Sequence, residues 1–255
     1  MTESSFDREA AAAYLASALT RDRFLLYCQP IVQVTAPQAD QSFFEVLVRF
    51  RDEEEGLLPP GSFIPVLQEA GLMPLLDRWV VATAIRQLRS AVGGHGGAPV
   101  PRFSINLSAE ALTDATFPAF VGAELAGASD LTGRLMLEIP LHDAFQRSAE
   151  FGAAVSALTE LGCVVAVSGV SRDDTEIGRL YAMGVRYIKV NGASALRAEP
   201  NPDALERLRR LGETCRALGM KMIAESVERA EAIGLLRSLK VEFAQGFALG
   251  EPKPL

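Results

Sequence analysis

Short apolar runs recur along the chain, and most of them end in a polar side chain. Six runs after residue 100 have the length and the branched or aromatic content of strands: residues 102–107, 135–139, 164–167, 187–190, 222–224 and 243–249. Segments with helical apolar spacing fill the gaps between them. Because a continuous apolar run indicates a strand buried on both faces, this alternation predicts parallel strands covered by helices.

The first part of the chain has a different order of elements. An alanine-rich helix is expected within residues 10–19, and strands are expected at 24–32 and 43–50. The polar segment between these strands is too short for a helical crossover, so the strands are predicted to run antiparallel. We therefore divide the chain into an N-terminal helical segment, residues 1–22, and a barrel domain, residues 23–255.

About eight strands in roughly 230 residues fit an α/β fold of the TIM-like (β/α)8 barrel type, with an antiparallel first strand. An open, doubly wound sheet is the alternative. The 255 residues, 49% of them hydrophobic, can bury one large core. In either fold, functional groups gather at the carboxyl ends of the strands.

Five polar residues fall at these strand ends: Glu45, Asn106, Glu138, Lys189 and Glu225. The four that carry oxygen could coordinate magnesium or manganese, and the lysine could orient a water or hold a phosphate. Satisfied ion pairs and hydrogen bonds at the barrel rim are the alternative explanation for the same residues. The run at 164–167 breaks the series, because it ends in Ser168 and Gly169.

Charge and composition narrow the possible partners. A net charge of -7 argues against a general nucleic-acid surface, which needs clustered Lys and Arg. Cys28, Cys163 and Cys215 are odd in number and lack metal-ligand spacing, which is typical of a protein in the reducing cytoplasm. We expect neither a signal peptide nor a membrane span, since no long apolar run is present.

A series of short motifs follows one order along the chain: Tyr27-Cys28-Gln29-Pro30-Ile31, Glu45-Val46-Leu47-Val48-Arg49, Phe63-Ile64-Pro65, Asn106-Leu107-Ser108, Leu137-Glu138-Ile139, Tyr187-Ile188-Lys189, Ala224-Glu225-Ser226-Val227-Glu228 and Gln245-Gly246-Phe247. In these motifs the chain resembles an EAL domain over nearly all of residues 24–254. EAL domains are the family of cyclic di-GMP phosphodiesterases and their degenerate relatives. Together the motifs are specific, although each alone is weak.

The resemblance implies a TIM-like barrel with an antiparallel first strand and a ligand, cyclic di-GMP. In active members, two divalent ions bind the scissile phosphate and activate a water. The matching positions would be Glu45, Asn106 and Glu138 for one ion and Glu225 for the other. Lys189 would lie beside the attacking water.

The departures from the family pattern fall in this machinery. Active members have two aspartates where this chain has Ser168 and Gly169, and two further carboxylates are replaced by Asn191 and Leu141. Asp173 and Asp174 lie too far along the chain to substitute and are expected to cap the next helix. We therefore predict severely impaired hydrolysis, vestigial roles for Lys189 and Glu225, and no cofactor, with magnesium or manganese only if residual activity remains.

Several residues that would contact the dinucleotide are retained: Gln29, Glu45, Leu47, Arg49, Asp77, Asn106, Glu138, Gln245 and Phe247. The planar guanidinium of Arg49 suits a phosphate, and Asp77 could accept from a guanine edge. For Asp77 the alternative is an exposed position on a helix surface. Three glutamates facing a dianionic ligand without metals count against binding.

The Glu-Val-Leu motif and the missing aspartate pair resemble the FimX type of degenerate EAL domain, which holds cyclic di-GMP without cleaving it. The resemblance implies a catalytically inactive cyclic di-GMP receptor that signals through an unidentified protein partner. A nucleotide-independent protein-interaction domain is the first alternative. A weak cyclic di-GMP phosphodiesterase is the second.

Overall fold

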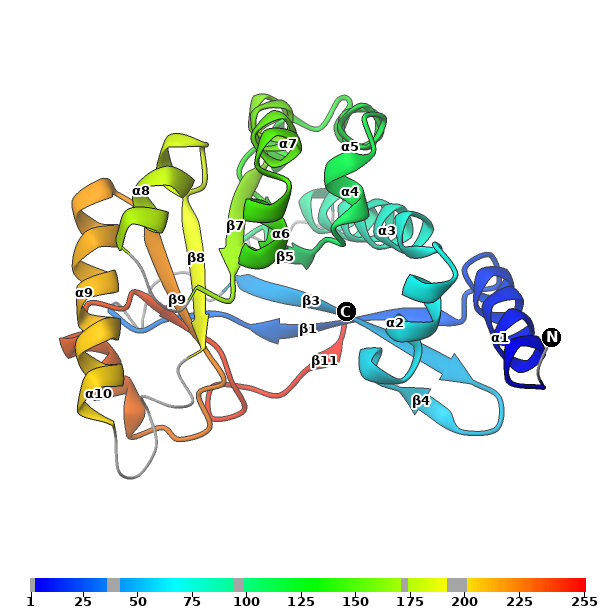
Figure 1. Ribbon diagram of the computed structural model, residues 1–255, viewed down its shortest axis with the longest axis horizontal. Coiled ribbons are helices and arrows are strands. Elements are labelled where there is room, and N and C mark those ends of the chain that lie inside the picture. Colours follow the sequence, from blue (N-terminus) through cyan, green and yellow to red (C-terminus); the bar gives the residue numbers. More distant parts are fainter. Residues whose placement is uncertain (1–2, 36–41, 94–98, 171–173, 192–200) are drawn as a thin grey trace.

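The computed structural model describes residues 3–35, 42–93, 99–170, 174–191 and 201–255. Its strands form one sheet in the order β11-β1-β3-β5-β6-β7-β8-β9-β10-β2, with β4 beside β3 (Figure 1). The strands are β1 Phe24–Pro30, β2 Val32–Gln33, β3 Phe43–Asp52, β4 Gly56–Leu58, β5 Arg102–Asn106, β6 Leu135–Pro140, β7 Val164–Ser168, β8 Tyr187–Asn191, β9 Lys221–Glu225, β10 Phe243–Ala244 and β11 Lys253–Pro254.

The sheet closes into a barrel through its first segment. β1 and β2 are separated by Ile31 alone, yet they lie near opposite ends of the strand order. Ile31 N donates to Phe43 O and Val34 N donates to Glu242 O, both at 2.8 Å, so this segment is bonded on both sides. It runs antiparallel to β3 and β10, whereas β3 and the strands from β5 to β10 pair in parallel. The predicted barrel with an antiparallel first strand is confirmed.

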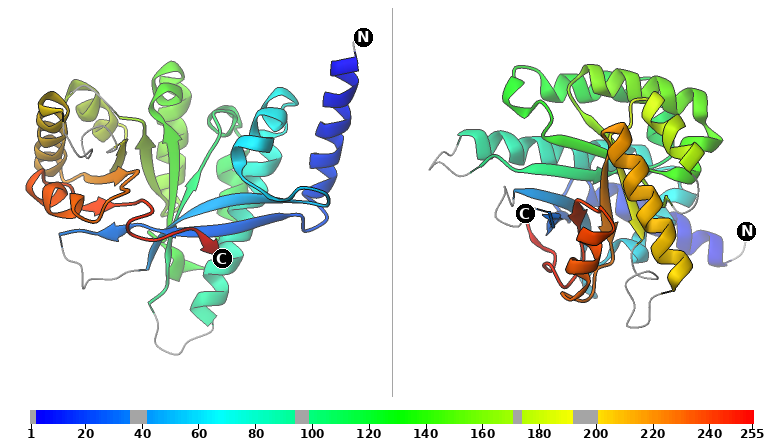
Figure 2. Two further views of the ribbon diagram at one scale, coloured as in Figure 1. Left: turned by 90° about the horizontal axis from the view of Figure 1, so that it is seen from below. Right: turned by 90° about the vertical axis from the view of Figure 1, so that its left-hand side faces the viewer.

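Helices surround the barrel and bury their apolar faces in one large core (Figures 1 and 2). The helices are α1 Glu3–Ala18, α2 Pro60–Glu69, α3 Met73–Gly93, α4 Glu110–Thr113, α5 Phe117–Leu125, α6 Leu141–Gln146, α7 Ser148–Glu160, α8 Asp174–Ala182, α9 Pro202–Leu218 and α10 Ala232–Ser238, with a 3-10 turn at Ser129–Leu131. α9 ends at Gly219, whose φ of 72° is the left-handed conformation that terminates helices. None of these helices, within the described parts of the chain, is long and apolar enough to cross a membrane.

Inside the barrel, an apolar tier lies below a polar tier. The apolar tier consists of Ile31, Phe43, Met136, Ala166, Ile223 and Phe243. Alternate residues of a strand point to the same face, so the residues two positions nearer the carboxyl end of the barrel also point inward. They are Gln29, Glu45, Glu138, Ser168, Glu225 and Gln245. The alternation of the strands therefore places a ring of polar side chains above an apolar floor, with a serine on β7.

Two predicted elements differ in length from the structure. The run expected as a strand over 243–249 ends as β10 at Ala244, and the chain turns at Gly246. Gly246 has a φ of 155°, and a Cβ there would lie 2.2 Å from Val227 O, so only glycine fits this close approach. Phe247 consequently lies outside any strand. α1 spans Glu3–Ala18, so it begins two residues before Ser5, the residue expected to cap it.

The N-terminal helix packs outside the barrel, next to α2 (Figure 2). Leu15 and Ala18 are its buried residues, at 5% and 2% exposure. The division of the chain between residues 22 and 23 stays a prediction. Of the two aspartates expected to cap a helix, Asp173 lies outside the described residues, and α8 begins at Asp174.

Candidate functional site

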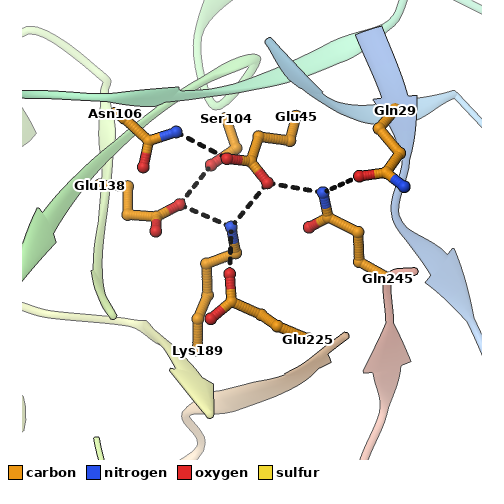
Figure 3. A network of polar contacts seen from close by, with 8 residues as sticks. All are labelled: Gln29, Glu45, Ser104, Asn106, Glu138, Lys189, Glu225 and Gln245. Carbon is orange, nitrogen blue, oxygen red and sulfur yellow. Dashed lines mark hydrogen bonds and ion pairs between the residues drawn. The ribbon is translucent and has the colours of Figure 1, made fainter. Parts of the chain in front are cut away.

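Four strands bring charged side chains together at the carboxyl end of the barrel (Figure 3). Glu45 on β3, Glu138 on β6 and Glu225 on β9 surround Lys189 on β8. Lys189 Nζ lies 3.1 Å from Glu45 Oε2, 2.7 Å from Glu138 Oε2 and 3.1 Å from Glu225 Oε1. The lysine is 0% exposed. Its ammonium is therefore the internal counter-ion of three carboxylates, the ion-paired arrangement that the sequence left open as an alternative to a metal site.

Amide side chains hold Glu45 from both sides (Figure 3). Asn106 Nδ2 donates to Glu45 Oε1 at 2.6 Å, and Gln245 Nε2 donates to Glu45 Oε2 at 2.6 Å. Gln245 Nε2 also donates to Gln29 Oε1 at 2.9 Å, and Gln29 Nε2 donates to Gly250 O at 3.0 Å. These bonds connect the predicted residues of β1, β3, β5 and the segment after β10 into one network.

Ser104 belongs to this network but was not predicted from the sequence. Its Oγ donates to Glu138 Oε2 at 3.3 Å, and the residue is 0% exposed. It precedes Asn106 by two positions on β5, so strand alternation places both side chains on one face. That alternation was the signal that could have identified it.

The protonation of the cluster follows from burial and mutual contact. Burial alone would lower the pKa of Lys189, but the three carboxylates around it raise that pKa above its ordinary value. Burial opposes ionisation of Glu45, yet the ammonium of Lys189 and the amide donors lower its pKa. Burial raises the pKa of Glu138, and the charges of Glu45 and Glu225 add to that effect. The cluster therefore holds a lysine whose charge is stabilised, and a glutamate, Glu138, whose pKa stays above its ordinary value although Lys189 opposes the rise.

The residues present do not fit the two divalent ions of active family members. The carboxylates all point at the ammonium of Lys189, and Asn106 uses its amide N–H to bond Glu45. Across the described ranges, no group of three His, Cys, Asp or Glu side chains is arranged to hold a metal. A pair of hard dications needs anionic oxygens between them, and the arrangement provides an ammonium instead.

The four altered positions add no carboxylate to the cluster. Ser168 is half-buried at the end of β7, and Gly169 follows with a left-handed φ of 74°. Asn191 ends β8 opposite Glu225 in the strand register and is exposed. Leu141 begins α6 and packs against the hydrophobic core. The gap at β7 noted in the sequence therefore persists in three dimensions.

A cavity of about 450 Å³ lies beside the cluster, between the middle of β3 and helices α2 and α3. Leu47, Asp77 and Asn106 contribute to its wall, together with apolar residues of both helices. Asp77 is 3% exposed, so the alternative of an exposed helix surface is wrong. Ser108 Oγ donates to Asp77 Oδ2 at 2.5 Å, and Ser108 N donates to Asp77 Oδ1 at 3.3 Å. The cavity thus combines an apolar wall with one buried carboxyl group.

Asp77→Asn should make the fold more stable at pH 8, by about 1 to 3 kcal/mol. Burial raises the pKa of Asp77 to about 6. A raised carboxyl pKa means that the native state binds a proton more tightly, so this contribution to stability is lost as pH rises from about 4 through 6. The amide avoids that loss. Urea unfolding at pH 8 and at pH 4.5 measures the free energy of unfolding of the Asp77→Asn protein and of the parent. The difference between the two proteins should be smaller at pH 4.5.

The control for this prediction is Asp143→Asn, a half-buried carboxyl in the wall of the same cavity. It should show no comparable gain between the two pH values. An Asp77→Asn protein that is no more stable than the parent at pH 8 contradicts the prediction.

A second hollow, of about 230 Å³, has Glu45 in its wall. Gln29, Glu225, Gln245 and Phe247 contribute to its wall. Phe247 is 66% exposed, the highest exposure among the exposed large apolar residues described. Gln245 Oε1 is buried and has no hydrogen-bond partner among the described residues. This hollow therefore offers an aromatic face, and one residue of its wall carries a buried acceptor without a hydrogen-bond partner among the described residues.

Arg49 is a cation on β3, four residues beyond Glu45, and it has no ion pair among the described residues. It lies on the same face of β3 as Glu45 and Leu47. Its Nη1 donates to Val48 O at 2.9 Å, and its guanidinium lies 5.5 Å from the centre of the Tyr27 ring. No carboxylate pairs with it in the part of the chain that the structure describes. The guanidinium is available to an anion.

Comparison with protein-family models gives a match to the EAL domain over residues 12–252, which is nearly the whole chain. The chain belongs to the EAL domain family. One relative is the cyclic di-GMP phosphodiesterase PdeF of Escherichia coli (strain K12), 28% identical over 249 residues. That match covers 98% of this chain and 32% of PdeF, so this EAL chain spans about a third of the curated relatives that it matches first.

Solved EAL structures have the same fold. The Xanthomonas citri FimX EAL domain in complex with cyclic di-GMP superposes with a TM-score of 0.88 at 22% identity, covering 99% of this chain and 96% of that chain. The PaMucR phosphodiesterase in its cyclic di-GMP complex gives a TM-score of 0.84 at 25% identity, covering 96% and 98%. The EAL barrel is therefore established for this chain, and it is shared by a FimX EAL domain and by a phosphodiesterase, both solved in complex with cyclic di-GMP.

Proposed function

We propose that this EAL domain is a cyclic di-GMP receptor that holds the dinucleotide without cleaving it and acts through a protein partner. The observation that carries the proposal is a pair of hollows next to the polar cluster: Glu45 lines the smaller one, and its hydrogen-bond partner Asn106 lines the larger one. A cyclic dinucleotide has two bases joined through a phosphodiester ring. Two adjacent hollows separated by a polar floor match that shape better than one enclosed pocket does.

Each hollow has groups that suit a guanine. Asp77 is a buried acceptor at the edge of the apolar cavity, where it could receive N–H donors from a base. Phe247 gives an exposed ring for stacking, and Gln245 Oε1 gives a second buried acceptor. Arg49 supplies a planar cation for a phosphate. The cluster between the hollows contributes the floor.

The charge of that floor is smaller than three glutamates suggest. Lys189 neutralises one carboxylate, and the raised pKa of Glu138 reduces the cost of protonating a second. A dianionic ligand therefore meets less negative charge than the sequence indicates. This lowers the main electrostatic objection to binding without metal ions.

The proposed function leaves out hydrolysis because the carboxylates around Lys189 lack the aspartates of active family members. No carboxylate stands at β7 or at the end of β8, where the family pattern of active members has aspartates. Without them, nothing described here would hold two ions close together against their mutual repulsion. A domain that binds protein but no nucleotide is the competing function, because the cluster is internally satisfied.

Calorimetric titration with cyclic di-GMP tests the proposal. We expect saturable binding at about micromolar concentration, with equal affinity in EDTA and in magnesium. Absence of heat up to tens of micromolar ligand supports the protein-binding alternative. Affinity that depends strongly on magnesium contradicts the assignment of Lys189 as the resident cation.

A further inference from the structure

Two faces of helix α2 contact different parts of the molecule. Phe63 and Leu67 are buried on one face, at 2% and 0% exposure. Pro60, Ile64 and Gln68 follow each other at intervals of four residues on another face and form part of the wall of the larger cavity. The same ten-residue helix therefore contacts the hydrophobic core on one side and the cavity on the other.

The buried face of α2 belongs to an aromatic cluster that also receives α1. The Phe63 ring lies 5.4 Å from that of Phe24 and 6.0 Å from that of Phe50. Tyr14 of α1 meets Phe50 edge to face at 5.8 Å, and Leu15 is buried in the same core. α1 and α2 also pack directly on each other.

Polar contacts attach α1 to the hairpin of β3 and β4. Tyr14 Oη of α1 donates to Asp52 Oδ2 at 3.0 Å, and Arg23, which lies between α1 and β1, pairs through Nη1 with Glu53 Oε1 at 2.7 Å. The Arg23 guanidinium stacks over the rings of Tyr14 and Phe50, at 4.9 and 5.4 Å from their centres. β3 is also the strand that carries Glu45 and Leu47 to the site. α1 is thus joined to two elements that build the cavity.

α2 is weakly held by its own backbone. It has ten residues, no side-chain cap at Pro59, and a proline at position 65. Pro65 has no N–H to donate within the helix, and no side chain caps the first turn, where Ser62 N donates to Pro59 O at 3.0 Å. A short helix of this kind depends on packing for its position. Its position therefore depends on what α1 and the cavity present to it.

We propose that docking of α1 sets the position of α2 and so couples α1 to occupancy of the cavity. A ligand that packs against α2 would stabilise the docked position of α1. Displacement of α1 would lower the affinity for that ligand by the same factor. The identity of this ligand, cyclic di-GMP, rests on the proposed function. The mechanical link between α1 and α2 does not.

The link is tested without ligand by hydrogen exchange of the Leu15→Ala protein. Amides of residues 60–69 should exchange at least about tenfold faster than in the parent, because the truncated side chain loosens α1. Leu208→Ala is the matched control: it makes the same truncation at a buried position of α9, which packs on α8 and β9. It should leave α2 unchanged. Leu15→Val gives the milder form of the test if the alanine variant does not fold.

With cyclic di-GMP present, exchange in residues 9–18 of the parent should slow, and Leu15→Ala should lower the affinity about tenfold. Unchanged exchange of α2 in the ligand-free Leu15→Ala protein, while α1 itself is loosened, overturns the coupling. A parent protein that binds no cyclic di-GMP overturns the proposed function instead, and the ligand-free comparison still decides the coupling.

Discussion

Lys189→Met is expected to lower the free energy of unfolding at pH 8 by about 3 to 5 kcal/mol, because it leaves three glutamates without their counter-ion. For a chain of this size, that corresponds to a fall in the thermal midpoint on the order of 10 °C. Methionine keeps the length of the side chain, so the loss of packing is small. Thermal unfolding followed by circular dichroism measures the change.

The pH dependence of this loss has a definite sign. Without the ammonium, the buried glutamates should titrate above their ordinary range, so stability falls as pH rises through their raised pKa values. The deficit of Lys189→Met should therefore be largest at pH 8 and smaller near pH 5. A deficit that grows toward low pH would contradict the role assigned to Lys189.

Lys221→Met provides the matched control. Lys221 Nζ pairs with Glu242 Oε1 at 2.7 Å on the same barrel, but the two side chains are 45% and 29% exposed. Exposed pairs of this kind contribute about 0 to 1 kcal/mol. If Lys189→Met and Lys221→Met lower the free energy of unfolding by the same amount, the ion pairs of Lys189 contribute no more to stability than an exposed pair does.

Arg49→Ala is expected to weaken cyclic di-GMP binding by about 10- to 150-fold, the equivalent of about 1.5 to 3 kcal/mol for hydrogen bonds to a charged group. The guanidinium has no carboxylate partner among the described residues, so its loss should leave the fold intact. Calorimetry gives the affinity, and the thermal midpoint checks the fold.

Arg51→Ala serves as the control for this experiment, since Arg51 lies two residues further along β3 and is exposed beside the pairing with β4. The affinity of the Arg51→Ala protein for cyclic di-GMP should stay within about twofold of the parent value at physiological salt, because exposed charges further from the ligand than a Debye length are screened. Equal losses in both variants would mean that Arg49 acts through general charge and not through contact with a phosphate.

Much of the site could be predicted because the barrel follows from strand patterns. A strand has a period of two, so an apolar residue such as Phe43 and the polar residue two positions later must share one face. That rule fixes Glu45, Glu138 and Glu225 on the inner face at the same end of the barrel. The gap at Ser168 could also be predicted, because β7 obeys the same alternation.

The exact partners could not be predicted, since they depend on how far each side chain reaches across the barrel. A lysine at the end of a strand looks like a rim residue, yet the register sets Lys189 level with Ile223 and below the mouth. Asp77 lies on a helix, and its burial against Ser108 depends on how α3 packs over the end of β5. The early end of β10 at Ala244 and the turn at Gly246 depend on the close approach of Gly246 to the backbone of Val227, which lies in the segment after β9.

Recovery of bound nucleotide tests the central claim most directly. The protein is incubated with cyclic di-GMP and magnesium or manganese, separated from free ligand, and denatured, and the released nucleotide is identified by chromatography. We predict intact cyclic di-GMP in about equimolar amount and no more linear product than a Glu45→Ala protein gives. Linear dinucleotide that accumulates with the parent and disappears with Glu45→Ala would contradict the account.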